Sequence, residues 1–253
     1  MTHRPIALSC GEPAGIGPEL AQLAWDRLRS GVPFVWIGDP SHLAPTHPWQ
    51  PVADLSEVYE VAKTAMPVLP LEFAGDARKG SADPRNASGV IAAIETAVSL
   101  TQSGQAAAVC TAPIHKQALQ DGAGFEHPGH TEFLAALAGQ TDVVMMLASP
   151  DMRVVPATIH IPLADVPTAL TPEGLRRTID ITRDALIHEF GIAAPRIAVA
   201  GLNPHAGEGG KIGLEEQDWI NDLIADMTRD DPGLRGPLPA DTMFHARARA
   251  TFD

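Results

Sequence analysis

Residues 6–37, IALSCGEPAGIGPELAQLAWDRLRSGVPFVWI, carry the pattern that decides the fold. A short apolar run at 6–9 breaks into a loop rich in Gly and Pro, and a second apolar run follows at 34–37. Between them a helix is expected at about 18–29, and it begins with Pro-Glu, a pair that favours a helix start. The order strand, loop, helix, strand is typical of an α/β unit with parallel strands.

The same alternation continues along the chain. Helical spacing of apolar residues predicts helices, and short apolar runs bounded by loops predict strands. The expected helices are 87–100, 172–190 and 215–227, and the expected strands are 106–110, 143–147, 154–159 and 197–200. Residues 41–84 are rich in proline and only weakly periodic, so they support no assignment. The fold class is therefore α/β with a mainly parallel sheet, in which ligands gather at the carboxyl ends of strands.

Composition narrows the class of protein. The chain has 253 residues, a net charge of −13 and 45% hydrophobic residues. Such an anionic field disfavours nucleic acid as a partner. No stretch approaches the roughly 18–20 apolar residues of a membrane-spanning helix, and the N-terminus is too short before the first strand for a signal peptide. Cys10 and Cys110 do not make a disulfide framework, which favours a reducing cytoplasm.

The loop 11–19, GEPAGIGPE, is the first candidate binding segment. Its glycines allow close backbone approach, and the helix start that follows offers free amides to an anion or a cofactor. The spacing does not match the dinucleotide-binding fingerprint, and a proline lies inside it. A tight turn needed only for packing explains the loop equally well.

The segment 125–133, FEHPGHTEF, is the second candidate. Gly129 precedes His130 and Thr131, which places two polar side chains at an expected helix start, where they could hold a phosphate or a carboxylate. The plainer alternative is that Thr131 caps the helix and that His130 is only exposed.

His160 and His205 each follow an expected strand. Because the carboxyl ends of parallel strands share one edge of a sheet, the two imidazoles could meet there and bind a divalent transition metal. Spacing alone does not establish this, since a single histidine after a strand is more often structural. The run 207–211, GEGGK, is not a phosphate loop, because that motif needs glycine at position 205 and serine or threonine at Ile212.

Taken in order, these motifs resemble those of the 4-hydroxythreonine-4-phosphate dehydrogenase family of pyridoxal phosphate biosynthesis. The resemblance runs over nearly the whole chain, and its two most specific stretches are GLNPHAGEGG and PGHTEF. The similar stretches are GEPAGIGPE (11–19), TAPIHK (111–116), PGHTEF (128–133), VVMMLA (143–148), TIHIPL (158–163), GLNPHAGEGG (201–210) and GPLPADTMF (236–244).

The resemblance implies a two-domain α/β/α subunit of the isocitrate and isopropylmalate dehydrogenase type, in a cytoplasmic homodimer. We expect residues 1–125 to form the domain on the cofactor side, and residues 126–253 to form the domain with the metal, substrate and dimer contacts. The implied activity is oxidation of 4-phosphooxy-L-threonine by NAD or NADP with loss of carbon dioxide, giving 3-amino-2-oxopropyl phosphate. A divalent metal (Zn, Mg, Co or Mn) is the implied second cofactor.

The family's site residues carry over motif by motif. His160 and His205 resemble metal ligands, which in the family come from different subunits of the dimer. His130 and Thr131 resemble substrate ligands. Asp241 matches an acidic residue near the substrate and is a candidate general base. The resemblance assigns no cofactor-binding residue to this sequence.

The sequence is also C-terminally shortened relative to the family. Family members continue past the position of Asp253 with a third metal-binding histidine and with residues that grip the substrate phosphate. Either the sequence is part of a longer protein, or it is a short variant with weak metal binding, little dehydrogenase activity and exposed apolar surface.

Two other functions remain open at this point. Relatives with the same metal and NAD chemistry oxidise phosphorylated threonate or erythronate, or cis-dihydrodiol carboxylates. A degenerate homologue would instead bind a metal or ligand without catalysis.

Overall fold

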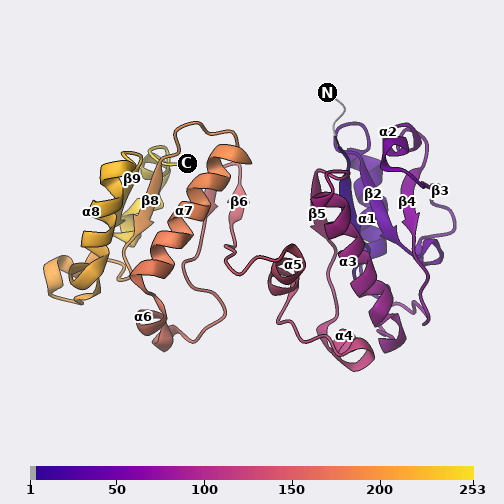
Figure 1. Cartoon of the computed structure of the whole chain (residues 1–253), viewed down its shortest axis with the longest axis horizontal. Helices are drawn as coiled ribbons and strands as arrows, with labels where there is room; N and C mark the ends of the chain where they lie inside the picture. The colour runs from indigo at the N-terminus through magenta and orange to yellow at the C-terminus, as the bar shows by residue number, and fades with distance from the viewer. Residues whose placement is uncertain (1–3) are drawn as a thin grey trace. The chain divides into compact units, whose positions relative to one another are not determined.

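The computed structural model describes residues 4–253 (Figure 1). Contacts divide the chain into two compact units, of which the first ends at Thr141 and the second covers Asp142–Asp253. This division lies later in the chain than the boundary predicted at residue 125. The assignment of cofactor and metal roles to domains 1–125 and 126–253 stays a prediction.

The first unit is built on a five-stranded sheet with the order β3-β4-β2-β1-β5, and every pair in it is parallel. The strands are β1 (Ile6–Ser9), β2 (Phe34–Gly38), β3 (Trp49–Pro51), β4 (Met66–Pro70) and β5 (Ala108–Thr111). Each residue of β2 is buried, which explains why its sequence is a continuous apolar run rather than an alternating one. The predicted α/β class with a parallel sheet is confirmed.

The helices of this unit join the sheet to the segment that carries His130. They are α1 (Gly17–Leu28), α2 (Val58–Val61), α3 (Ala87–Gln102), α4 (Lys116–Ala123) and α5 (His130–Ala138), with 3-10 turns at Pro40–His42, Leu55–Glu57 and Pro84–Asn86. α3 packs on β1, β2 and β5. Its other side contributes Val90 and Ile94 to an apolar cluster with Leu119 of α4 and Phe133 of α5. The start of α5 is therefore fixed by a packed core.

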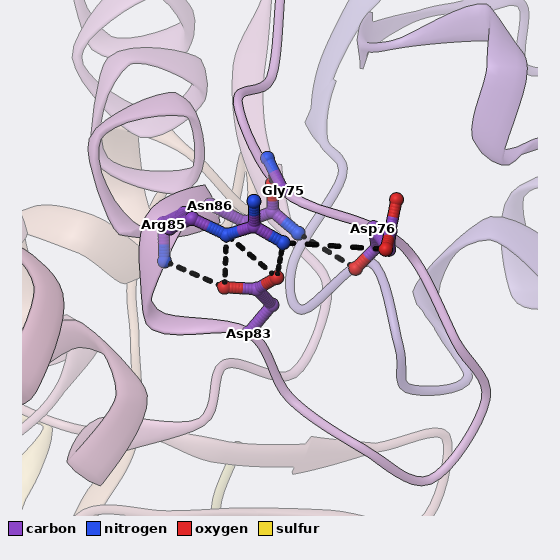
Figure 2. Close-up of polar contacts among 5 residues, drawn as sticks. All are labelled: Gly75, Asp76, Asp83, Arg85 and Asn86. Atoms are coloured by element: carbon purple, nitrogen blue, oxygen red, sulfur yellow. Dashed lines mark hydrogen bonds and ion pairs between the residues drawn. The ribbon is translucent and has the colours of Figure 1, made fainter.

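A polar clamp holds the loop that leads into α3 (Figure 2). The Asn86 side chain, 1% exposed, accepts a hydrogen bond from the Gly75 amide at 2.8 Å and donates one to the Asp76 carbonyl at 3.2 Å. Asp83 pairs with Arg85 at 2.5 Å, and hydrogen bonds from Arg85 lower the pKa of the Asp83 carboxyl to about 2. These contacts order part of the stretch that sequence patterns left unassigned.

The second unit contains two small sheets. β6 (Leu147–Ser149) and β7 (Met152–Val154) form an antiparallel hairpin, and β8 (Ile197–Ala200) pairs in parallel with β9 (Leu234–Leu238). The helices are α6 (Val166–Ala169), α7 (Pro172–His188), α8 (Asn221–Asp230), α9 (Ala240–Met243) and α10 (Ala246–Arg249), with 3-10 turns at Leu163–Asp165 and Ala206–Gly210 and a π-helical turn at Glu216–Ile220. Thr171 caps α7, since its hydroxyl accepts a hydrogen bond from the Gly174 amide at 3.1 Å.

The strands predicted at 143–147 and 154–159 are wrong. A tight turn divides this apolar stretch, because the Ser149 hydroxyl accepts hydrogen bonds from the amides of Asp151 (3.3 Å) and Met152 (3.2 Å). The result is the short β6–β7 hairpin, and residues 155–159 are not in a strand. Apolar content alone could not reveal the reversal.

An apolar cavity of about 420 Å³ lies beside β8 in this unit. Residues 154–158, the inner face of α7, β8 and Phe252 line it. Within residues 4–253, β9 is the only strand that pairs with β8. Neither His205 nor Asp241 lines the cavity, which separates it from the residues expected to carry chemistry.

Both cysteines are free, and they differ in environment. Cys110 is exposed, whereas Cys10 is buried, and burial raises the pKa of the Cys10 thiol to about 12. That thiol is therefore unreactive near neutral pH. Across residues 4–253, every helix is too short or too polar to cross a membrane.

Gly17 is predicted to be indispensable for packing at the start of α1. A β-carbon at this position would lie 2.1 Å from the Cys10 carbonyl oxygen, a contact that only a backbone shift relieves. We expect Gly17→Ala to lower the free energy of unfolding by about 1–3 kcal/mol, measured by urea denaturation. Gly31→Ala is the control, because a β-carbon there meets nothing within 4 Å; equal losses in both variants would contradict the packing argument.

Candidate active site

The parallel pairing of β8 with β9 brings two of the predicted site residues together. His205 follows β8 and Asp241 follows β9, so both lie at the carboxyl edge of this sheet. Backbone hydrogen bonds from Gly201 to Leu238 (2.8 Å) and from Asp241 to Pro204 (3.2 Å) join the two segments. The His205 Nε2 atom then lies 3.7 Å from Asp241 Oδ2.

Two polar side chains fix the loop that carries His205. Glu216, 2% exposed, accepts a hydrogen bond from the Asn203 amide at 2.8 Å. The Asn203 side chain accepts from the His205 amide at 3.1 Å and donates to the Ile212 carbonyl at 2.9 Å. The two ends of the loop are thereby tied to each other and to the helix that follows.

The second ring nitrogen of His205 has its own partner. Nδ1 lies 2.8 Å from Glu208 Oε1. The hydrogen bond to Glu208, followed by the charge of Asp241, raises the pKa of His205 above its usual value. With Nδ1 bound to a carboxylate, Nε2 is the nitrogen left to face Asp241, which suits a ligand to a divalent cation.

The structure does not connect His160 with this pair. The strand that was expected to end at His160 is not formed, so the strand-end argument does not place it at the edge of β8. His160 is exposed and has a φ of 58°. In residues 4–253, no group of three or more His, Cys, Asp or Glu side chains is gathered to hold a metal ion. A metal role for His160 stays a prediction.

His130 and Thr131 begin α5, as the sequence predicts. The N-cap is Gly129 and no side chain caps the helix, so the alternative in which Thr131 is the cap does not hold. The His130 Nε2 atom is buried without a hydrogen-bond partner. Burial and, to a smaller extent, the charge of Lys116 lower the pKa of His130. The helix start thus offers free amides, a hydroxyl and a neutral imidazole to a ligand.

Lys116 is a candidate site residue that sequence reasoning did not identify. It is exposed at the start of α4, and a β-carbon on Gly129 would lie 3.7 Å from its ammonium nitrogen and 3.5 Å from Glu132 Oε2. The available signal was its position at the end of the TAPIHK stretch. Its charge makes the start of α5 more favourable for an anion.

The loop 11–19 fits the packing alternative. The Glu12 side chain turns back to accept a hydrogen bond from the Ala14 amide at 3.0 Å, and the Glu12 amide donates to the Pro113 carbonyl at 2.8 Å. Gly11 adopts a φ of 68° against Ala112 and Pro113. Packing of the loop is therefore sufficient to explain its glycines.

Sequence comparison decides the family. A profile of the family described as pyridoxal phosphate biosynthetic protein PdxA matches residues 32–253. The chain belongs to this family. Among curated PdxA relatives, the 4-hydroxythreonine-4-phosphate dehydrogenase of Ruegeria sp. (strain TM1040) is 65% identical over 100% of this chain and 78% of the relative. The enzyme of the same name from Paracoccus denitrificans (strain Pd 1222) is 56% identical over 99% of this chain and 77% of its own length.

Solved structures support the membership of the PdxA family. The 4-hydroxythreonine-4-phosphate dehydrogenase of Burkholderia phymatum superposes with a TM-score of 0.87 at 33% identity, over 100% of this chain and 79% of that one. A terephthalate 1,2-cis-dihydrodiol dehydrogenase of Burkholderia xenovorans LB400 superposes with a TM-score of 0.69 at 25% identity, over 99% and 77% of the two chains. The predicted α/β fold with a parallel sheet is thus confirmed as the fold of this family's solved structures.

The pKa of His205 is expected to lie above the ordinary value of a histidine. The Glu208 hydrogen bond is the larger cause of its raised pKa, and the Asp241 charge is the next. Replacing Glu208 by Gln should therefore lower the midpoint more than replacing Asp241 by Asn, as followed by NMR of the His205 ring protons in metal-free protein. An unchanged midpoint in both variants would show that neither carboxylate interacts with the ring.

The pKa of His130 is expected to lie below the ordinary value of a histidine, because of burial and then the charge of Lys116. Lys116→Met removes a like charge and should raise the midpoint. The pKa of His130 should still lie below the ordinary histidine value in this variant, because burial is the larger cause of the shift and is unchanged. Lys79→Met serves as the control, since Lys79 pairs with Glu19 and Lys116 is the charge that lowers the pKa of His130; a similar rise in the control would contradict a local effect of Lys116.

Proposed function

We propose that this chain acts as a 4-hydroxythreonine-4-phosphate dehydrogenase in pyridoxal 5'-phosphate biosynthesis. The reaction is oxidation of the secondary alcohol of 4-phosphooxy-L-threonine with NAD or NADP as hydride acceptor, followed by loss of carbon dioxide to give 3-amino-2-oxopropyl phosphate. The observation that carries the proposal is the 65% identity, over the whole chain, to a relative of that name. The convergence of His205 and Asp241 at one sheet edge supports it.

The proposed metal ligands are His160 and His205. The donor chemistry fits, because imidazole nitrogen suits divalent zinc and similar transition metals, and the hydrogen bond of Nδ1 to Glu208 leaves the Nε2 atom of His205 for such a bond. A divalent ion in this position supplies a Lewis acid that lowers the pKa of the substrate hydroxyl and stabilises negative charge on its oxygen. We place Asp241 beside it as the candidate general base, since its carboxylate lies within 4 Å of the His205 ring.

The start of α5 is the proposed substrate-binding segment. His130 and Thr131 stand where the free amides of the helix attract an anion, and the lowered pKa of His130 keeps its imidazole neutral near pH 7. A neutral imidazole can donate one hydrogen bond and accept another, which suits a substrate that carries both phosphate and hydroxyl groups.

The remaining parts of the proposal concern assembly and location. We propose a homodimer in which His160 of one subunit and His205 of the other complete one metal site, which is in keeping with the lack of a three-residue cluster in residues 4–253. We place the enzyme in the cytoplasm, where its two free thiols remain reduced.

A related dehydrogenase activity is the second candidate. The likeness to a terephthalate 1,2-cis-dihydrodiol dehydrogenase, at a TM-score of 0.69, favours shared machinery with a different substrate. The identity of 25% with that protein is far below the 65% with the Ruegeria relative. A panel of 4-phosphooxy-L-threonine, phosphorylated threonate or erythronate and a cis-dihydrodiol carboxylate separates the candidates, because turnover of the dihydrodiol alone would overturn the first.

The activity test pairs two charge-removing variants in the full-length protein. Asp241→Asn is expected to lower kcat for NADH formation from 4-phosphooxy-L-threonine by about 100-fold or more. Asp226→Asn is the matched control, because Asp226 forms surface ion pairs with Arg176 and Arg229 and has no contact with the loop of His205. Removal of divalent metal by a chelator should abolish turnover, and its return should restore it. Unchanged kcat in Asp241→Asn would remove Asp241 from the proposed mechanism.

A further inference from the structure

The loop from His205 to Gly210 has an unusual backbone. The φ angles of Ala206, Gly207, Glu208 and Gly209 are 50°, 71°, 44° and 68°, so four successive residues lie in the left-handed region. Glycine adopts this region freely, whereas alanine and glutamate do so at a cost. Within residues 4–253, only three non-glycine residues have positive φ, and two of them are Ala206 and Glu208.

This backbone turns the Glu208 side chain back onto the His205 ring. The Oε1 atom of Glu208 lies 2.8 Å from His205 Nδ1, although both side chains are 51% exposed. An exposed ion pair three residues apart contributes little stability by itself, so it does not compensate for two strained residues. Strain of this kind is retained where it holds a functional group in place.

The hydrogen bond to Glu208 determines which ring nitrogen of a neutral His205 carries the proton. An ionised carboxylate only accepts hydrogen bonds, so a neutral His205 must carry its proton on Nδ1 to bond Glu208. Nε2 then has a free lone pair, and it points toward Asp241 Oδ2 at 3.7 Å. The other tautomer would present an N–H in that direction and could not bind a cation through Nε2.

We propose that Glu208 is the positioning residue of the metal site, which selects the Nδ1–H tautomer of His205 and orients Nε2 as a metal ligand. Carboxylates commonly orient metal-binding histidines in this way. The anchors at Asn203 and Glu216 fix the backbone of the loop, whereas Glu208 fixes the ring. This inference rests on the proposed function only in that His205 binds a divalent cation.

The first test reads the tautomer directly and needs no metal. Side-chain ¹⁵N NMR of His205 is recorded in metal-free protein, well above the midpoint of its titration. The wild type is expected to show the Nδ1–H form, and Glu208→Ala should shift the ring toward the Nε2–H form. Ala206→Gly is the control, because it relieves strain at a neighbouring left-handed residue and retains the carboxylate. An identical tautomer in wild type and Glu208→Ala overturns the proposal.

The second test measures the consequence for metal binding. Zinc titration by calorimetry is expected to give about 10- to 100-fold weaker binding for Glu208→Ala, a smaller loss for the isosteric Glu208→Gln, and no loss for Ala206→Gly. His205→Ala distinguishes a failure of the proposed metal site from a failure of the positioning role of Glu208. If His205→Ala binds zinc as tightly as the wild type, His205 is not a ligand, and the proposed metal site fails whatever the tautomer. If His205→Ala loses zinc but Glu208→Ala does not, only the positioning role is overturned.

Discussion

The parallel pairing of β8 with β9 is the constraint on which the candidate site depends. Two neighbouring parallel strands end at the same edge of the sheet, so the residues that follow them lie close together. His205 and Asp241 are 36 positions apart in the printed numbering (241 − 205), and the pairing reduces that separation to a 3.7 Å contact. The anchors at Asn203 and Glu216 then limit how far the first loop can move.

The sequence predicted the elements that have a strong local pattern. α3, α7 and the strands β1, β2 and β8 begin within a residue of their expected starts, because each combines clear periodicity with a loop signal at its end. The apolar stretch around Ser149 failed, since a side-chain hydrogen bond reverses the chain inside it. The meeting of His205 with Asp241 was not predicted, because no strand was expected before Asp241, where β9 lies. The contact of Glu208 with His205 depends on a left-handed backbone that no local pattern indicates.

The pKa values of His130 and His205, two histidines of the candidate site, are shifted in opposite directions. His130 is partly buried near an ammonium group, so its pKa falls and it is neutral near pH 7. His205 is exposed between two carboxylates, so its pKa rises, and its ring is held by the hydrogen bond to Glu208. The first environment suits contact with an anionic ligand through a neutral group, and the second suits a ring that must keep one orientation. Environment therefore assigns different roles to two residues of one type.

Backbone strain is concentrated at and near the two predicted metal-binding histidines. Within residues 4–253, the three non-glycine residues with positive φ are His160, Ala206 and Glu208. The first is a predicted metal ligand, and the other two lie within three residues of His205, the second predicted ligand. Glycine would adopt these angles without strain. At position 208 the contact of the carboxylate with His205 accounts for the side chain that is retained. His160 shares the positive φ although no contact in the described chain explains it. In the homodimer proposed above, a contact from the partner subunit would give the strain at His160 the role proposed for Glu208 at His205, which is to fix the orientation of an imidazole.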